Sequence, residues 1–332
     1  MRVLLIKLSS MGDVIHTLPA INDAYQNIPD LKISWLIEPG FAEIANWHPA
    51  VEKVITLPLR KKQYAQIFTN LKELRKEKFD LILDAQGLLK SAVLARIARG
   101  NKRVGFDWPS AREHVASVFY DQNYSASWQL HAVTRLRNLF AQVFGYKIPQ
   151  DIVDYGVKLQ ANENITTCDA PYLMFLHGTT WDSKHWPEAY WIALANLVAQ
   201  HGYHVHVTWA TTEQQQRAQR IAAKAANVIV LPHLTINQAA TVLARSKGVV
   251  AVDTGFAHLS AALAKPTVAL FGATDVRKCA TLGQKTINLA SKFKCSPCAR
   301  RTCNLPTMND LYPPCYAELS PQIVWDNLVT IL

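Results

Sequence analysis

The regular alternation of short apolar runs with segments of helical periodicity limits how this chain can fold more than any other feature. In the first half, apolar runs that predict strands lie at residues 3–6, 33–37, 54–57, 81–83 and 103–104. Segments that predict helices lie between and after them, notably 68–76, 88–98 and 131–144. Strands that alternate with helices in this way favour a parallel, doubly wound sheet.

The same alternation begins again in the second half. Predicted strands lie at residues 172–176, 205–208, 228–231, 249–252 and 268–271, and predicted helices at 188–199, 213–225 and 236–244. Between the halves, residues 145–170 contain Pro149, several Asp and Asn residues and few periodic apolar positions, which is typical of a linker. A chain of 332 residues is also long for one core. We therefore predict an α/β fold of two Rossmann-like domains that face each other across a cleft.

We place the N-terminal domain at residues 1–155 and the C-terminal domain at 170–315. The last segment, 316–332, contains an amphipathic stretch that begins at Pro321, and proline is common in the first turn of a helix. We expect a helix there, and one arrangement open to it is to pack back on the N-terminal domain.

The chain is basic, with a formal net charge of +10 at pH 7. This charge favours an anionic partner, which can be nucleic acid, a phospholipid surface or a phosphorylated substrate. The densest basic run is Arg60-Lys61-Lys62, for which a solubilising surface is the alternative explanation. The basic residues do not alternate with aromatic ones and no nucleic-acid-binding motif is present, which argues against nucleic acid.

The apolar runs do not predict secretion or a membrane span. The first one, at residues 3–6, is too short for a signal sequence, and no small-residue cleavage site follows it. Asp253, His258 and Lys265 interrupt the longest apolar region, so that no run reaches the length that a membrane span requires. We expect a soluble, cytoplasmic protein.

A loop of small residues, Asp253-Thr254-Gly255, connects a predicted buried strand to a predicted helix. The apolar run 249–252 comes before it, the helical segment 256–263 after it, and strand 268–271 completes a βαβ unit. A hydroxyl residue and a glycine at this point allow backbone amides to approach a phosphate closely. In a parallel sheet such a loop lies at the carboxyl edge, where α/β proteins bind ligands. The sequence therefore predicts a phosphate site here.

A second polar loop follows the first predicted strand of the C-terminal domain. It contains Thr179, Thr180 and Lys184, all of which can point at a diphosphate. Lys184 would supply the compact positive charge that stabilises a phosphate leaving group. In the alternative interpretation Lys184 is a surface lysine and Trp186 is a core residue that caps the sheet.

Near the N-terminus, a turn of small residues after the first predicted strand carries Asp13. A carboxylate at the carboxyl edge of one sheet, opposite a phosphate-binding edge on another, has the geometry of a general base between an acceptor and a donor. The alternative is a purely structural role, because aspartate is also a good helix N-cap.

Four of the six cysteines gather near the C-terminus, at Cys295, Cys298, Cys303 and Cys315. Their ligand type and the spacing C-x2-C-x4-C-x11-C suit a structural zinc site. A plain turn with buried thiols is the alternative, and we favour it. A disulfide framework is less expected in a cytosolic chain.

Several motifs, in this order, resemble one known family. They are Ser9-Ser-Met-Gly-Asp13 followed by Leu18-Pro-Ala20, then Asp84-Ala-Gln-Gly-Leu88, Lys184-His-Trp-Pro187, and Asp253-Thr-Gly255 with His258. On two repeated α/β units, this set is similar to the lipopolysaccharide heptosyltransferases of glycosyltransferase family 9, and to their type I members in particular. The similarity extends from residue 1 to roughly residue 275.

The resemblance implies a GT-B fold and an inverting, metal-independent transfer of heptose from ADP-L-glycero-D-manno-heptose. The acceptor that it implies is a Kdo sugar of Kdo2-lipid A at the inner face of the cytoplasmic membrane. We accordingly expect a monomer that is peripherally attached to that membrane, takes ADP-heptose and Kdo2-lipid A as partners, and needs no cofactor and no nucleic acid.

The resemblance also implies roles for individual residues. In the family, the aspartate that matches Asp13 is the base that takes the proton of the acceptor hydroxyl. The positions that contact the nucleotide sugar match Thr179, Thr180, Lys184, Asp253, Thr254, Gly255 and His258. Glu213, one position earlier than the acidic residue that holds the ribose in relatives, is the candidate for that contact. We expect acceptor contacts from Ser9, Ser10, Gly12, Arg60, Lys61, Lys62, Gln86 and Arg112.

Two alternative functions stay open. The cysteine-rich segment is more similar to heptosyltransferases II and III, which favours an enzyme that adds a later core heptose. From a different class, a non-catalytic basic protein that binds anions would also explain the net charge.

Overall fold

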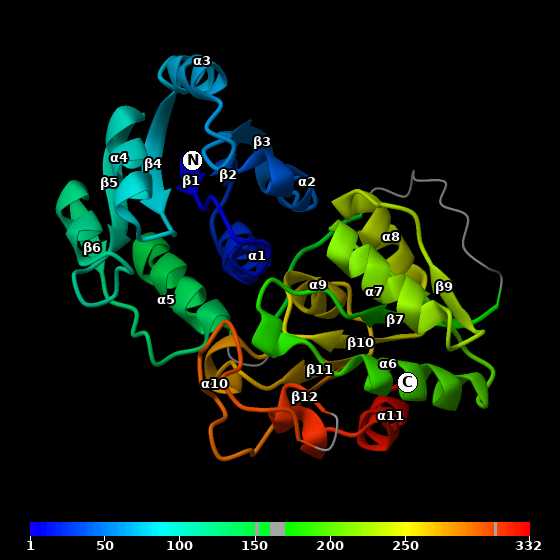
Figure 1. Cartoon of the computed structure of the whole chain (residues 1–332). Coiled ribbons are helices and arrows are strands. Elements are labelled where there is room, and N and C mark those ends of the chain that lie inside the picture. Colours follow the sequence, from blue (N-terminus) through cyan, green and yellow to red (C-terminus); the bar gives the residue numbers. More distant parts are fainter. Residues whose placement is uncertain (150–152, 160–169, 309–310) are drawn as a thin grey trace. The chain divides into compact units, whose positions relative to one another are not determined.

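The computed structural model of this chain describes residues 1–149, 153–159, 170–308 and 311–332 (Figure 1). The chain divides into two compact units, Met1–Gln160 and Ala161–Leu332. Much of the predicted linker, 145–170, lies outside the described residues.

The first unit is built on a six-stranded parallel sheet with the strand order β3-β2-β1-β4-β5-β6. Its strands are β1 (Arg2–Ile6), β2 (Lys32–Ile37), β3 (Val51–Thr56), β4 (Lys78–Asp84), β5 (Arg99–Phe106) and β6 (Gln122–Tyr124). Its helices are α1 (Met11–Asn27), α2 (Ala42–Ala45), α3 (Tyr64–Leu74), α4 (Leu89–Ile97) and α5 (Ala132–Phe144), with short 3-10 helices η1 (Pro39–Phe41) and η2 (His114–Phe119).

Helices lie on both faces of this sheet. The chain moves from β1 to β2 through α1 and, in the opposite direction across the sheet, from β4 to β5 through α4. Since such crossovers are right-handed, these two helices lie on opposite faces. One core cluster joins Leu4, Ile6 and Ile82 of the strands to Leu74 of α3 and Leu94 of α4. α1 packs against α5 (Figure 1).

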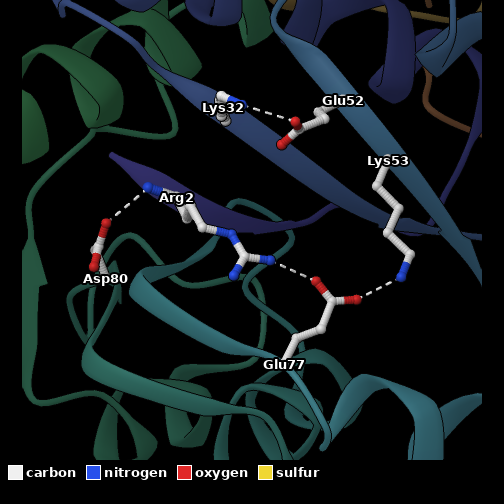
Figure 2. Close-up of polar contacts among 6 residues, drawn as sticks. All are labelled: Arg2, Lys32, Glu52, Lys53, Glu77 and Asp80. Atoms are coloured by element: carbon white, nitrogen blue, oxygen red, sulfur yellow. Dashed lines mark hydrogen bonds and ion pairs between the residues drawn. The ribbon is translucent and has the colours of Figure 1, made fainter.

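Ion pairs lie at the amino ends of β1, β2, β3 and β4 (Figure 2). Glu77, just before β4, accepts hydrogen bonds from the side chains of Arg2 and Lys53, and the backbone amide of Arg2 donates to Asp80 at 2.8 Å. The cations of these pairs are about half exposed and Glu77 is half-buried, so that each pair contributes at most about 1 kcal/mol to stability. These pairs lie at the edge of the sheet opposite to the carboxyl ends of the strands, where the candidate site residues lie.

The second unit repeats this architecture, with the strand order β12-β11-β10-β7-β8-β9 and parallel pairing throughout. Its strands are β7 (Tyr172–Leu176), β8 (His204–Val207), β9 (Val228–Val230), β10 (Gly248–Val252), β11 (Thr267–Phe271) and β12 (Thr286–Ala290). Its helices are α6 (Glu188–Ala199), α7 (Thr212–Ala222), α8 (Ile236–Arg245), α9 (Gly255–Ala262), α10 (Val276–Cys279) and α11 (Pro321–Val329), with η3 (Asp182–Lys184) and η4 (Pro314–Glu318).

The C-terminal helix α11 begins at Pro321, where the sequence predicts a helix. It packs on α6 and on the sheet of the second unit. A contact of this helix with the N-terminal domain stays a prediction. Val324, Trp325 and Leu328 belong to the same core cluster as Trp191 of α6 and Val250 of β10. The apolar face of α11 is therefore buried within its own unit.

The two sheets have equivalent strand orders, and this order determines where each unit can hold a ligand. In each unit the first three strands add successively toward one side of the sheet, and the last three strands add toward the other side, beginning next to the first strand. Loops that leave the two central strands therefore diverge and open a crevice at the carboxyl edge. In the first unit the crevice lies between β1 and β4, and in the second between β7 and β10. Asp13 follows β1, and Lys184 and Asp253 follow β7 and β10.

Candidate active site

In the first unit, Asp13 lies in the first turn of α1, with one side of its carboxylate tied down. The backbone amide and the hydroxyl of Ser10, the N-cap residue, both donate to Oδ2 of Asp13 at 2.8 Å. Within the described part of the chain, no donor contacts the other oxygen, Oδ1. The two interpretations of Asp13 are thus compatible, because Oδ2 belongs to the capping box while Oδ1 stays available to accept a proton.

Positive groups surround this carboxylate. Burial raises the pKa of Asp13, but the Lys7 ammonium, the two bonds from Ser10 and the Arg112 guanidinium outweigh it and hold the pKa below its ordinary value. Lys7 is itself buried, and its Nζ donates to the carbonyl of Ala85 at 3.1 Å. Burial lowers the pKa of Lys7, and the carboxylates of Asp13 and Asp84 act in the opposite direction. Asp13 is consequently ionised at neutral pH, as a general base must be.

The loop after β4 fixes the loop that leads to Asp13. Oε1 of Gln86 accepts from the backbone amides of Leu8 and Ser9 at 3.0 and 3.4 Å. Gln86 is in turn held by Asp84, a buried carboxylate that accepts from the amide of Gln86 and from the hydroxyl of Tyr120. Gln86, predicted as an acceptor contact, therefore has at least a positioning role.

The other predicted acceptor contacts lie at the same edge of the sheet but differ in exposure. Ser9 is buried, Gly12 is half-buried, and Ser10 and Arg112 are exposed. The exposed run Arg60, Lys61 and Lys62 follows β3, and the amide of Arg60 donates to Glu38 in the loop after β2. These basic side chains can thus contact an anionic ligand at this edge.

In the second unit, the two predicted phosphate loops meet at an ion pair. Lys184 Nζ lies 2.7 Å from Asp253 Oδ2, and both side chains are largely buried. Thr274, after β11, donates to the same oxygen at 2.6 Å, and the hydroxyl of Thr179 donates to the carbonyl of Asp253 at 3.3 Å. Lys184 is thus neither a free surface lysine nor an isolated positive charge: Asp253 orients its ammonium and compensates its charge.

The N-terminus of α9 lies beside this pair. Thr254 is the N-cap residue with extended backbone, and Gly255 is the first helical residue. The free amides of a helix N-terminus favour an anion, so this end can hold a phosphate as the sequence predicts. His258, one turn further on, is buried in the helix. Trp186 is fully buried and donates to the carbonyl of Leu319, which makes it a core residue.

A pocket of about 550 Å³ opens next to Thr179 and Thr180. Its lining includes Glu213, which is exposed at the start of α7, and Arg217 one turn later. Gly178 lies against this pocket, since a Cβ at that position would come within 2.8 Å of the side chain of Gln214, another lining residue. The pocket thus brings the three predicted donor residues Thr179, Thr180 and Glu213 together.

Several charged and polar residues at both edges were missed by the sequence analysis. In the first unit they are Lys7 and Arg135, and in the second His185, Arg217, Thr274 and Arg301. Arg301 lies with its guanidinium 5.8 Å from the Trp181 ring, over which Lys184 Nζ lies at 4.5 Å. A sequence signal existed only for His185, which stands next to Lys184 in the Lys-His-Trp-Pro motif.

The four clustered cysteines line one small cavity of about 10 Å³, together with Ser183 and Gly272. Burial raises the pKa of the Cys315 thiol to about 12, and the other three cysteines act in the same direction. Among the residues that the structure describes, no group of three or more His, Cys, Asp and Glu side chains is arranged to hold a metal ion. Of these four thiols, only Cys315 is buried, whereas Cys298 and Cys303 are half-buried and Cys295 is exposed, so the favoured alternative of buried thiols is right for Cys315 alone. Zinc binding stays a prediction.

Comparison with known proteins assigns the chain to a class. The family model of glycosyltransferase family 9 (heptosyltransferase) matches residues 67–309. The chain belongs to this family of glycosyltransferases, as its motifs had indicated. Lipopolysaccharide heptosyltransferase 1 of Pseudomonas aeruginosa is 44% identical, over 100% of this chain and 98% of that protein. The enzyme of the same name from Escherichia coli (strain K12) is 45% identical, over 83% of this chain and 89% of that protein.

Solved structures agree with this assignment. E. coli heptosyltransferase WaaC with ADP superposes with a TM-score of 0.82 at 43% identity, over 88% of this chain and 93% of that one. WaaC with ADP-2-deoxy-2-fluoro heptose gives the same TM-score at 38% identity, over 99% of both chains. E. coli heptosyltransferase II, at 18% identity and a TM-score of 0.79, shares the fold. The predicted α/β fold of two Rossmann-like domains, the GT-B fold of these enzymes, is confirmed.

Proposed function

We propose that this chain transfers L-glycero-D-manno-heptose from ADP-heptose to a Kdo sugar of Kdo2-lipid A, with inversion at the anomeric carbon. The observation that carries the proposal is the state of Asp13. Its carboxylate is ionised, is held through Oδ2 alone, and keeps Oδ1 available at the carboxyl edge of its sheet.

The chemistry needs one base and one site for the leaving group. Asp13 Oδ1 takes the proton of the acceptor hydroxyl as the hydroxyl oxygen forms a bond to the anomeric carbon of heptose. The bond from that carbon to the diphosphate breaks in the same displacement, and ADP leaves with the electron pair. One carboxylate suffices for such an inverting step.

The leaving group acquires charge that Lys184 and the amides at the N-terminus of α9 can stabilise. Because Asp253 compensates the charge of Lys184, we propose that the diphosphate is bound through N–H donors of the oriented ammonium and of the free amides of α9, and that this binding takes the place of a metal ion. The pocket beside Thr179 and Glu213 has the size for a nucleoside, and relatives with this fold have been solved with ADP and with an ADP-heptose analogue. We therefore assign the donor to the second unit.

The acceptor carries phosphates and Kdo carboxylates, and the first unit offers it exposed cations at Arg60, Lys61, Lys62 and Arg112. No helix among the described residues combines the length and the apolar character that crossing a bilayer requires. We infer that a monomer reaches its lipid-anchored acceptor by peripheral attachment to the inner face of the cytoplasmic membrane.

A thin-layer assay that offers ADP-heptose with either Kdo2-lipid A or an already heptosylated core tests this function. We expect the enzyme to consume Kdo2-lipid A and to leave the heptosylated core unchanged. Consumption of the heptosylated core alone would reject the proposed acceptor and support an enzyme that adds a later heptose. Salt-dependent RNA binding without ADP-heptose binding would support the non-catalytic alternative.

A further inference from the structure

Exposed aliphatic side chains gather on two packed helices of the first unit. Leu89 and Val93 lie one turn apart on α4 and are 41% and 39% exposed. Val115 and Val118 lie three residues apart on η2, hence on one side of a 3-10 helix, and are 50% and 62% exposed. α4 and η2 pack against each other. We call these four side chains the apolar ridge.

One end of the apolar ridge begins at the candidate acceptor edge. Leu89 comes directly after the loop that carries Gln86, and its amide donates to Glu113 at 2.7 Å. The amide of Glu113 donates back to the carbonyl of Gly87 at 3.0 Å. The ridge is therefore fastened to the loops that carry Gln86 and Arg112. Trp108, in the same loop as Arg112, is 53% exposed and stacks on His114.

A basic pocket lies at the other end of α4, around Ile97. Its volume is about 370 Å³, and the charged residues in its lining are Arg75, Lys78, Arg96, Arg99 and Arg103. Arg96 is one turn from Val93, and it meets Asp121, three residues after Val118, at 3.4 Å. Pocket and ridge are thus contiguous.

The charge of this basic pocket is largely uncompensated. Asp121 contacts Arg96 and Arg103, each at 3.4 Å. Among the residues that the structure describes, Arg75 and Arg99 have no carboxylate partner. An exposed pocket with several unpaired cations attracts anionic groups, and the attraction is strongest where many phosphates lie close together.

We propose that the apolar ridge, with Trp108 at one end and the basic pocket at the other, is the surface by which this protein docks on an anionic lipid bilayer. This inference rests on the proposed function, which requires the enzyme to reach a lipid-anchored acceptor. Interfacial proteins bind by inserting aliphatic and aromatic side chains while basic residues contact lipid phosphates, and this surface offers both. Because the ridge begins at the acceptor edge, docking brings lipid head groups to the edge where Asp13 lies.

Other occupants fit less well. Single-stranded nucleic acid is bound by several aromatic side chains on which successive bases stack, whereas this surface has four aliphatic side chains and one tryptophan, Trp108, which stacks on His114. The core of a protein interface is depleted of charge, whereas here five basic residues adjoin the apolar surface.

The test is co-sedimentation of the full-length protein with phosphatidylcholine vesicles that contain or lack phosphatidylglycerol. Val115→Ser/Val118→Ser should weaken binding about tenfold at low and at high salt. Arg75→Gln/Arg99→Gln should weaken it to a similar degree, but only on anionic vesicles and at low salt. Matched controls are Ile323→Ser/Val329→Ser, also exposed aliphatic residues, on α11, and Lys224→Gln/Lys247→Gln, exposed cations of the second unit. We expect the controls to bind within about twofold of the wild type.

Transfer activity separates docking from catalysis. Both surface variants should transfer heptose to a soluble Kdo2 acceptor without acyl chains at the wild-type rate, and should lose activity on Kdo2-lipid A in vesicles in proportion to the lost binding. The proposal is overturned if the surface variants bind vesicles like their controls, or if the wild type binds RNA and not vesicles. If vesicle binding depends on this surface but the wild type consumes no acceptor, the proposed function fails and the docking surface stands.

Discussion

At the scale of single residues, the account depends on Asp13. An Asp13→Asn variant keeps the side-chain oxygen that accepts from Ser10 but cannot take a proton. We expect its transfer rate to fall by about 10²–10⁴-fold, the usual contribution of a general base, with nearly unchanged affinity for the donor. Single-turnover kinetics and titration with ADP measure the two quantities separately. Turnover near the wild-type rate would show that another group is the base.

The pH profile tests the environment of Asp13. The pKa of this carboxyl lies below its ordinary value of 3.8. The base is active when it is deprotonated, so the acid limb of the wild-type pH profile of kcat/KM should lie below pH 3.8. In Lys7→Gln, the effect of burial would be opposed only by the two Ser10 bonds and the smaller effect of Arg112, and the pKa of Asp13 would rise. We expect the acid limb of kcat/KM to move to higher pH in this variant, and an unmoved limb would contradict the role of Lys7.

The Lys184–Asp253 pair makes a prediction about coupling. Lys184→Ala removes the cation and leaves the Asp253 carboxylate uncompensated beside the diphosphate. ADP affinity should therefore fall by more than the loss of the contact between Lys184 and the diphosphate would cause. The double variant Lys184→Ala/Asp253→Asn removes that repulsion and should bind ADP better than Lys184→Ala alone. Calorimetric titration of the wild type, the single variants Lys184→Ala and Asp253→Asn, and the double variant closes the cycle. If the losses of ADP binding free energy in the two single variants add up to the loss in the double variant, Lys184 and Asp253 do not act as a unit at the diphosphate.

At the scale of helices and strands, most of the two sheets was predictable from sequence. Strands such as β10, buried on both faces, have continuous apolar runs that leave few alternatives. α1 was not predicted as a helix, because Pro19, Asn22 and Asp23 interrupt its apolar pattern. All three are buried, and Asp23 pairs with Arg137 of α5 at 2.6 Å. The burial of Asp23 depends on Arg137, which lies 114 positions away in the sequence, and the periodicity of a single segment cannot reveal such a partner.

The same limit applies to the candidate site. Loops rich in hydroxyls and small residues identified Asp13, Thr179 and Asp253 as candidates. The ion pair between Lys184 and Asp253 arises because β7 and β10 are neighbours in the sheet, and the motifs alone could not show it. The buried Lys7 was missed for a similar reason, since its role depends on Asp84 and Asp13 around it.

The C-terminal helix α11 allows a test of its packing. Trp325 is 5% exposed in the core of the second unit, with its ring 4.8 Å from that of His201. Trp325→Ala should lower the free energy of unfolding by about 3–5 kcal/mol, because it removes a large buried side chain and leaves a cavity. Ile323→Ala, on the exposed side of the same helix, should change it by no more than about 0.5 kcal/mol. Urea denaturation followed by circular dichroism compares the two. Equal stability would mean that α11 does not complete this core.

At the scale of the whole molecule, the chain uses the same strand order twice for two different tasks. In the first unit, the crevice beside β1 holds an ionised carboxylate among cations. In the second, the crevice beside β7 holds an ion pair and a helix N-terminus. The proposed base and the proposed phosphate site on separate units fit a reaction that joins two separate substrates.

The most direct test of this account is heptosyl transfer in the presence of EDTA. Wild-type enzyme, Asp13→Asn and Lys184→Ala are incubated with ADP-heptose and Kdo2-lipid A, while ADP release and the mass of the acceptor are followed together. We expect the wild type to add one heptose per ADP released in the presence of EDTA, and Asp13→Asn to bind the donor but to add almost no heptose. Transfer that stops on chelation, or that continues at the wild-type rate in Asp13→Asn, would contradict it.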